Sequence, residues 1–486
     1  MKQPNIVLIM TDQLRGDCMG FMGHPDVKTP YLDTLASKGV AFDHAYSSCP
    51  TCIPARAALH TGMSQTGHGR VGYEDGVAWN YAHTMAGELS KAGYYTQCVG
   101  KMHVYPLRNL TGFHNVELHD GYLHYNRRVD VPYYENQRVA DDYMYWLKKE
   151  KGIEADVTDT GLECNSWVSR PWMYDEELHP TNWVTTRSID FLRRRDRSKP
   201  FFLMVASYLR PHPPFDAPQY YFDMYKDKKL APPALGDWED MCELRQKGRI
   251  FDSTTGPADE EMIRQARIGY YACVTHLDHQ IGRLLQAFID EGIYDDCIFI
   301  FTSDHGDELC DHHLFRKAFP YQGSVHIPMI ISGNTKFLGI KPDTVSHAVV
   351  ELRDVMPTVL DMAGAPIPET VEGISLLPYV KADHISKAVR PYLHGEHSFG
   401  EKSNHWIVTE NEKYIWFSQT GKEQYFDLAG DPHEEHNLID SPEAEDKIDR
   451  LRNILIAELD GREEGYSDGK RLITGRMPVN CLKKLR

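Results

Sequence analysis

The sequence has no long hydrophobic run and no excess of positive charge. No segment approaches the apolar length that crosses a bilayer, and the apolar run after Pro4 is too short for a secretory signal and lacks a small-residue cleavage site. We therefore expect a soluble, cytoplasmic protein without a membrane partner. Lysine and arginine number 53 against 70 acidic residues, and the resulting net charge of −17 argues against a nucleic-acid partner.

Cysteine is also sparse. The ten cysteines among 486 residues lack the regular spacing of a disulfide framework. Cys49 and Cys52 form one Cys-x-x-Cys pair, which could be redox-active or half of a metal site. A structural zinc site needs a second such pair, and the sequence has none.

Apolar runs alternate with helical patterns along the chain. The run Asn5–Met10 is continuous, which is typical of a strand buried on both faces of a parallel sheet. Similar runs, separated by helical segments, occur at Phe201–Ala206, Cys297–Thr302 and Pro328–Ser332. Pro30–Gly39 is predicted to be a helix. This alternation predicts an α/β fold with a doubly wound, mostly parallel sheet.

The chain divides into a large and a small part. Residues 1–378 are predicted to form the α/β domain, with insertions over 104–175 and 213–262. Residues 379–486 have short β-like pieces and then a helix from Pro442 to about Leu459, which predicts a smaller α+β subdomain with an antiparallel sheet. The polar tail after Gly461 is expected to be mobile or to form an oligomer contact.

Acidic residues follow two of the predicted strands. Asp12-Gln13 comes directly after the first strand, and Asp304-His305-Gly306-Asp307 comes after Cys297–Thr302. Because ligands bind beyond the carboxyl ends of strands in open α/β sheets, these side chains can assemble one divalent-cation site. The alternative is that each aspartate only caps a helix.

Basic residues follow other predicted strands. Lys101 and His103 come after a predicted strand around Tyr95–Val99, and His212 follows Phe201–Ala206. His312 and Lys317 lie downstream of Asp304. Taken singly, such residues are most often surface lysines and loop histidines, so their interest lies in their shared position at one edge of the sheet.

One short motif gives these residues a common chemistry. Cys52-Ile53-Pro54-Ala55-Arg56 has the pattern Cys-x-Pro-x-Arg, by which sulfatases have a cysteine oxidised to formylglycine. Along nearly its whole length the chain resembles the formylglycine-dependent (type I) sulfatases of the alkaline-phosphatase superfamily. The matching stretches, in the family's order, are Asn5–Asp12, Thr29–Asp33, Gly39–Phe42, Cys52–Gly62, Gly100–His103, His212–Phe215, Asp304–Gly306, Lys317, Asp354–Gly364, Gly373–Pro378 and Tyr425–Leu438.

The resemblance implies an alkaline-phosphatase-like fold and a sulfuric-ester hydrolase. Its nucleophile would be the geminal diol of a formylglycine made from Cys52 by a maturase. One hydroxyl attacks sulfur, and the other later expels sulfate. The expected substrate is a sulfate ester of a carbohydrate or an aryl alcohol. Histidines 394 and 397 and the insertion 104–175 could line its leaving-group pocket, although ordinary surface and subdomain packing is the alternative.

The resemblance also implies a metal site. Asp12, Gln13, Asp304 and His305 would hold a divalent cation, with calcium expected and manganese or magnesium as alternatives. Asp304 would also be the base for the attacking hydroxyl, because the metal lowers the pKa of that hydroxyl.

The remaining roles concern the sulfate and the protons. Arg56 would hold the modified residue 52, and Lys101 and Lys317 would bind the sulfate. His212 and Lys317 would approach the ester oxygen to supply a proton or positive charge to the departing alcohol. His103 would remove a proton from the second hydroxyl of residue 52.

Two positions depart from the family pattern. Many members have a second aspartate where this chain has Gln13, and an asparagine where it has His305. The Asp-Gln and Asp-His pairs also occur in related phosphonate monoester and phosphodiester hydrolases that use the same modified residue. That activity is therefore the alternative, and Lys101 with His103 favours the sulfatase.

Overall fold

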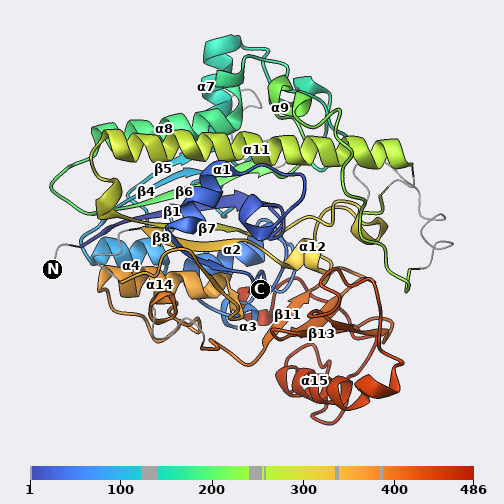
Figure 1. Cartoon of the computed structure of the whole chain (residues 1–486). Helices are drawn as coiled ribbons and strands as arrows, with labels where there is room; N and C mark the ends of the chain where they lie inside the picture. The colour runs from blue at the N-terminus through green and yellow to red at the C-terminus, as the bar shows by residue number, and fades with distance from the viewer. Residues whose placement is uncertain (1–2, 122–138, 240–253, 257–258, 334–338, 382–386) are drawn as a thin grey trace.

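A large eight-stranded sheet forms the centre of the computed structural model, which describes residues 3–121, 139–239, 254–256, 259–333, 339–381 and 387–486 (Figure 1). The strand order is β5-β4-β6-β1-β7-β8-β2-β9. The strands are β1 (Asn5–Asp12), β2 (Gly39–Phe42), β4 (Tyr95–Gly100), β5 (Asn115–Leu118), β6 (Phe201–Pro211), β7 (Cys297–Ser303), β8 (Met329–Gly333) and β9 (Thr344–Ser346).

Most of these strands are parallel, as the sequence predicted. The five strands from β5 to β7 pair parallel with their neighbours. β8 runs antiparallel to both β7 and β2, and β2 pairs parallel with β9. β2 and β9 therefore end at the same edge of the sheet as β1, β4, β6 and β7.

Helices cover both faces of the sheet. The helices are α1 (Pro30–Ser37), α2 (Cys52–Thr61), α3 (Gln65–His68), α4 (Met85–Lys91), α7 (Asp142–Lys151), α8 (Pro180–Arg194), α9 (Gln219–Asp223), α11 (Glu260–Asp290), α12 (Gln322–Val325), α14 (Val355–Ala363) and α15 (Glu445–Glu458). α8 and α11 lie on one face, and α4 and α14 lie on the other (Figure 1). No helix of the described residues is long and apolar enough to cross a membrane.

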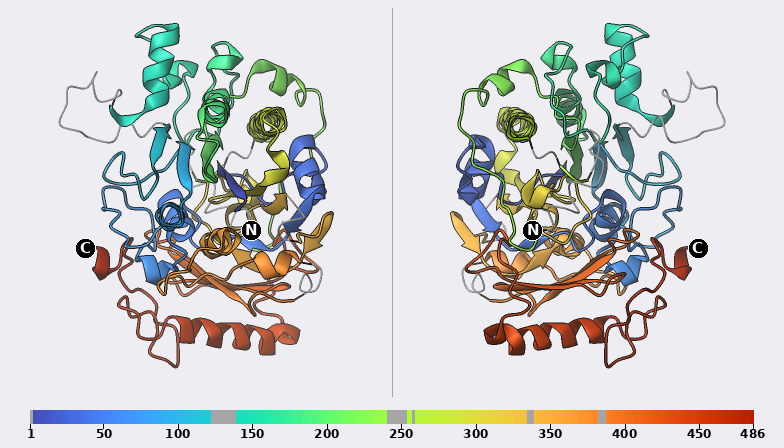
Figure 2. Two further views of the ribbon diagram at one scale, coloured as in Figure 1. Left: turned by 90° about the vertical axis from the view of Figure 1, so that its left-hand side faces the viewer. Right: turned by 90° about the vertical axis from the view of Figure 1, so that its right-hand side faces the viewer.

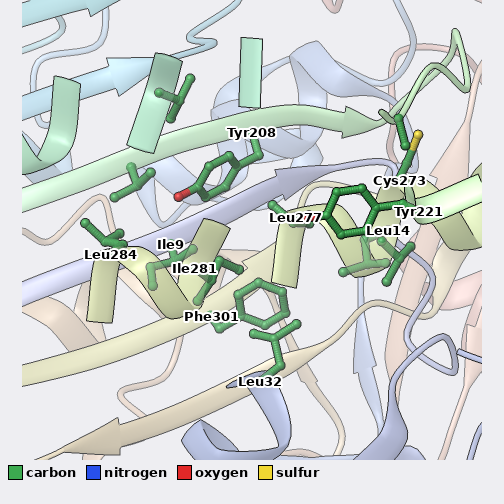
Figure 3. Packing of buried hydrophobic residues seen from close by; sticks show 14 of the residues in the cluster. Ile9, Leu14, Leu32, Tyr208, Tyr221, Cys273, Leu277, Ile281, Leu284 and Phe301 are labelled. Carbon is green, nitrogen blue, oxygen red and sulfur yellow. The ribbon is translucent and has the colours of Figure 1, made fainter. Parts of the chain in front are cut away.

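The first strand shows why two helical layers are needed. Val7 and Ile9 pack into the cluster beneath α8 and α11, whereas Ile6, Leu8 and Met10 pack into the cluster beneath α4 and α14. Figure 3 shows Leu277, Ile281 and Leu284 of α11 facing Ile9 and Phe301. Successive side chains of a strand point to opposite faces, so a strand apolar at every position requires a cover on both sides.

The helix predicted over Pro30–Gly39 ends two residues early. α1 ends at Ser37, because Gly39 begins β2. A Cβ atom at Gly39 would lie 2.2 Å from the carbonyl oxygen of Ile331. The glycine therefore allows a close approach of β2 to β8, and it does not belong to the helix.

The C-terminal region contains a second sheet and a helix. Four antiparallel strands, β11 (Leu393–His397), β12 (Asn404–Val408), β13 (Glu412–Phe417) and β14 (Glu423–Asp427), follow one another in order. α15 packs along the outer face of this sheet (Figure 2). This arrangement confirms the smaller α+β unit, while the boundary between residues 378 and 379 stays a prediction. A separate two-stranded sheet pairs β3 (Ala45–Tyr46) with β10 (Val350–Glu351).

The tail after Gly461 packs against the large domain, contrary to the expectation that it would be mobile, while an oligomer contact stays a prediction. The backbone N–H groups of Val71 and Gly72 both donate to the carbonyl oxygen of Asn480, and Leu482 N–H donates to Gly69. The polar composition of the tail suggested mobility, because backbone hydrogen bonds cannot be inferred from composition. Parts of the two predicted insertions, 122–138, 240–253 and 257–258, lie outside the described residues.

Candidate active site

The carboxyl ends of four neighbouring parallel strands bring the predicted polar residues together. Asp12 is the last residue of β1, and Asp304 follows β7 directly. Lys101 follows β4 and His212 follows β6. All four side chains are buried. The order β4-β6-β1-β7 therefore converts widely separated sequence positions into one cluster.

The N-terminal part of α2 delivers Cys52 and Arg56 to this cluster. Thr51 has extended backbone dihedrals, so the helix begins at Cys52 and places its side chain at the positive end of the helix dipole. Arg56 is four residues on and shares that helix face. Its guanidinium donates to Asp304 Oδ2 at 2.9 Å and to the carbonyl oxygen of Lys101 at 2.8 Å.

A set of potential metal ligands surrounds the thiol. Asp12, Cys52, Asp304 and His305 each offer one ligand atom, and these atoms lie within 4.8 Å of one another. His305 Nε2 is 3.7 Å from Asp12 Oδ1, 3.6 Å from Asp304 Oδ1 and 3.4 Å from Cys52 Sγ. Its Nδ1 lies 3.0 Å from the carbonyl oxygen of Gly306, which favours a proton there and leaves Nε2 as the ligand atom.

Gln13 joins the same group from the strand end. Its backbone φ is 69°, a left-handed conformation that is rare for a non-glycine residue and recurs at functional sites. Its amide nitrogen donates to Asp307, and its Oε1 accepts from Lys317 Nζ at 2.7 Å. Its backbone N–H donates to Asp304 Oδ1 at 3.1 Å.

Charge balance in the cluster shifts several pKa values. Burial opposes ionisation of Asp12, but Lys101, His212, Lys317 and Arg56 outweigh it and hold the pKa of that carboxyl well below 3.8. Lys101 Nζ donates to Asp12 Oδ2 at 2.6 Å, and despite burial the Asp12 charge raises the pKa of the lysine.

The thiol responds to the same charges. Burial and Asp12 raise the pKa of Cys52, whereas Lys101, Lys317 and His305 lower it, with a net value of about 7. The site therefore favours an anion at residue 52 itself, although two carboxylates are close to it.

Two histidines approach from the loops after β4 and β6. His212 donates from Nδ1 to the carbonyl oxygen of Pro213 at 2.8 Å, and burial with the Lys317 charge lowers its pKa well below 6.5. The backbone N–H groups of Met102 and His103 donate to Asp120 Oδ1 at 2.8 and 3.1 Å. Asp120 fixes this turn, and nothing in the sequence pattern had marked it.

A cavity of about 450 Å³ opens over the cluster. The site residues that line it are Cys52, Lys101, His103, His212 and Lys317. The insertion 104–175 contributes Asp120, Cys164 and Asn165, and the small sheet contributes His397.

Two histidines that the sequence offered as candidates do not line this cavity. His394 contacts His405, and His312 packs against Trp238. Each of the nine described cysteines is free, so Cys49 and Cys52 form no disulfide. The Cys-x-x-Cys alternative therefore receives no support from the site.

Comparisons with known proteins cover the whole chain. A family model described as Sulfatase matches residues 4–365, and one described as N-sulphoglucosamine sulphohydrolase, C-terminal, matches residues 310–460. An arylsulfatase of Clostridium perfringens (strain 13 / Type A) is 53% identical over 484 residues, with 100% of both chains covered.

Solved structures show the same fold. A phosphonate monoester hydrolase from Silicibacter pomeroyi is 26% identical, with a TM-score of 0.75, and the match covers 94% of this chain and 95% of that one. A protein in complex with its substrate D-glucosamine-2-N,6-O-disulfate has a TM-score of 0.76 at 22% identity, covering 97% of this chain and 100% of that one.

Proposed function

The chain belongs to the sulfatase family and is a sulfuric-ester hydrolase, and on that premise we propose that it acts through a formylglycine made from Cys52 and a divalent cation. The observation that carries the proposal is the position of Cys52. It begins α2 within 4.8 Å of the ligand atoms of Asp12, Asp304 and His305. A formylglycine at that position would supply a geminal diol, one hydroxyl of which attacks sulfur while the other later expels sulfate.

The donor set fits a divalent cation. Two buried carboxylates, an imidazole and the Gln13 amide oxygen are ligands that such cations accept. Calcium is the expected ion, and manganese is the alternative, because an imidazole at position 305 and an amide at position 13 make the site less anionic than a set of carboxylates. When bound, the cation would neutralise negative charge on the sulfate oxygens.

The chain's own cations complete the anion site. Lys101 and Lys317 both line the cavity beside Cys52, so they are placed to bind the oxygens of the sulfate group. Arg56 anchors Asp304 and the carbonyl oxygen of Lys101, which holds the cluster together around residue 52.

We assign proton transfer and charge stabilisation of the leaving group to side chains in the segments that follow β4, β6 and β7. Burial and then the Lys317 charge lower the pKa of His212, which favours its neutral form, so we assign to Lys317 the positive charge that would stabilise the departing alcohol. His103 lines the cavity with Cys52 and is the proposed base for the second hydroxyl of residue 52.

Mass spectrometry and paired variants test this function. After co-expression with a formylglycine-generating maturase, the peptide that contains residue 52 should carry the aldehyde. Cys52→Ala should then lower kcat/KM on an aryl sulfate by at least about 10³-fold, because the nucleophile is lost. Cys49→Ala is the matched control, because Cys49 is a buried cysteine in the loop just before α2. Unmodified cysteine in an active enzyme, or equal losses in both variants, would count against the proposal.

The alternative activity is hydrolysis of a phosphonate monoester or phosphodiester. The likeness to a phosphonate monoester hydrolase motivates it, together with the Asp-Gln and Asp-His pairs. Rates on matched aryl sulfate and aryl phosphonate esters separate the two activities. We expect the sulfate to react faster because Lys101 and His103 are present, and a faster phosphonate reaction would favour the alternative.

A further inference from the structure

His397 is a buried imidazole whose two ring nitrogens make no hydrogen bond to the described residues. Its side chain lines the active-site cavity, and the residue is 2% exposed. Among the residues that the structure describes, Nδ1 and Nε2 have no hydrogen-bond partner. Leaving buried polar groups unpaired is costly, so each one needs an explanation, and a partner that binds in function is one such explanation.

The position of His397 is fixed by the backbone on both sides. It is the last residue of β11, and it pairs with Asn404 of β12. Glu396 N–H donates to Ser48 at 2.8 Å, and Ser398 N–H donates to Val71 at 2.7 Å. These bonds join the small sheet to the loop before α2 and to the segment after α3. The ring is therefore held against the cavity by rigid contacts.

The charge state of the ring limits what it can recognise. Burial, then the charges of His305 and Lys317, lower the pKa of His397 to about 3. A neutral imidazole has one N–H donor and one acceptor nitrogen. The sulfate group has no proton to give to that acceptor, whereas a hydroxyl group can both accept and donate.

The neighbouring lining suits the carbon skeleton of such an alcohol. Phe399 packs edge-on against His397, with ring centroids 5.7 Å apart, and it also lines the cavity. Asn480, from the tail, adds an amide to the same wall. An apolar face beside a few placed polar groups is the usual composition of a site for a small polar molecule.

We propose that His397 recognises a second hydroxyl group on the alcohol that carries the sulfate, so that the substrate is a sulfated carbohydrate and not a simple aryl sulfate. The inference rests on the proposed sulfatase function and adds its substrate class. In this arrangement the large domain binds the sulfate, and the small sheet selects the leaving group.

Substrate pairs test this assignment. Wild-type enzyme and His397→Leu are compared on defined sulfated mono- and disaccharides and on 4-nitrophenyl sulfate, which has no hydroxyl group. We expect the variant to lose about 10- to 100-fold in kcat/KM on the preferred sugar sulfate, because a buried hydroxyl contact is lost. On 4-nitrophenyl sulfate its kcat/KM should stay within about twofold.

Two further variants separate recognition from stability. His397→Asn keeps a donor and an acceptor and should recover part of the lost selectivity. His394→Leu, on the same strand but outside the cavity lining, should keep the wild-type ratio between the two substrates. Thermal melting of each variant shows whether the fold is intact.

The outcomes are distinct. The role of His397 would be overturned if His397→Leu lost kcat/KM equally on both substrate classes, or lost none on either. It would also be overturned if the wild-type enzyme hydrolysed the aryl sulfate but no sugar sulfate. A wild-type enzyme that carries formylglycine and hydrolyses neither class of sulfate would instead overturn the proposed function.

Discussion

The large sheet carries two clusters of carboxylate and imidazole groups at the same edge. The active-site cluster (Asp12, Asp304 and His305, with Cys52) lies beyond β1 and β7. A second cluster, which we call the edge cluster, consists of Asp43, His44 and His347 beyond β2 and β9. In both, the potential ligand atoms lie within 4.8 Å of one another.

The surroundings of the two clusters differ. Asp12 and Asp304 are 0% exposed, and the cations Lys101 and Arg56 bind their oxygens. In the edge cluster the side chains of Asp43, His44 and His347 are 20%, 23% and 65% exposed. Both imidazoles bind the Asp43 carboxylate through Nδ1 at 2.7 Å, so the three groups largely satisfy one another.

This comparison shows that a position at a strand end does not by itself fix the burial or the charged partners of a carboxylate-imidazole cluster. The same topology brings together both sets of residues. Burial strengthens electrostatic interactions in the active-site cluster, and the added cations favour a bound anion. The edge cluster faces water, which weakens its interactions and supplies alternative partners.

The same substitution in both clusters should give the largest contrast. Asp304→Asn removes a proposed metal ligand and the carboxylate that binds Arg56, so kcat/KM on an aryl sulfate should fall by about 10³-fold or more. Asp43→Asn should change it by less than about threefold. Steady-state kinetics with formylglycine content matched by mass spectrometry measures both. Similar losses in the two variants would remove the distinction between the clusters.

Calcium binding should separate the clusters by a second measure. After chelator treatment, added calcium should raise the melting temperature of the wild-type protein by a few degrees, because a ligand at 100 times its Kd stabilises the fold by about 2.7 kcal/mol. The shift should disappear in Asp304→Asn and persist in Asp43→Asn. This readout is independent of turnover, and persistence of the shift in Asp304→Asn would place the cation elsewhere.

The sequence was sufficient to predict those residues of the site that directly follow the buried strands. Buried parallel strands are apolar throughout, so β1 and β7 could be predicted within two residues, whereas β6 continues five residues beyond the predicted run Phe201–Ala206. The polar residues after these strands became candidates. Topology then placed Asp12, Asp304 and His212 together. The structure confirms that convergence, while their individual roles stay predictions.

The remaining parts depend on contacts that composition does not encode. Asp120 acts through the backbone N–H groups of Met102 and His103, so no motif identifies it. The tail reaches the cavity at Asn480 through backbone bonds to Val71 and Gly72. The exposure of a side chain also cannot be read from the sequence. The pattern alone therefore does not distinguish Asp43-His44, which follows β2, from Asp304-His305, which follows β7.

The smallest expected effect is the pH dependence of the edge cluster. Burial lowers the pKa of His44, but its hydrogen bond to Asp43, the charge of that carboxylate and the nearby Glu410 outweigh burial and raise the pKa above 6.5. Because the folded value exceeds the unfolded one, the stabilisation is complete below about pH 6.5 and is lost as pH rises through the folded pKa. His44→Gln should therefore lower the free energy of unfolding at pH 6 by about 0.3–1 kcal/mol.

Urea denaturation of both proteins between pH 5.5 and about 9 measures this difference. The gap between wild type and His44→Gln should narrow as pH rises, because the wild-type imidazole loses its charge and the variant has none to lose. His433→Gln, at an exposed histidine of the small domain, controls for the removal of one imidazole. A gap that widens with pH would mean that His44 is stabilised as the neutral ring, and that its charge pairing with Asp43 contributes nothing to the stability of the fold.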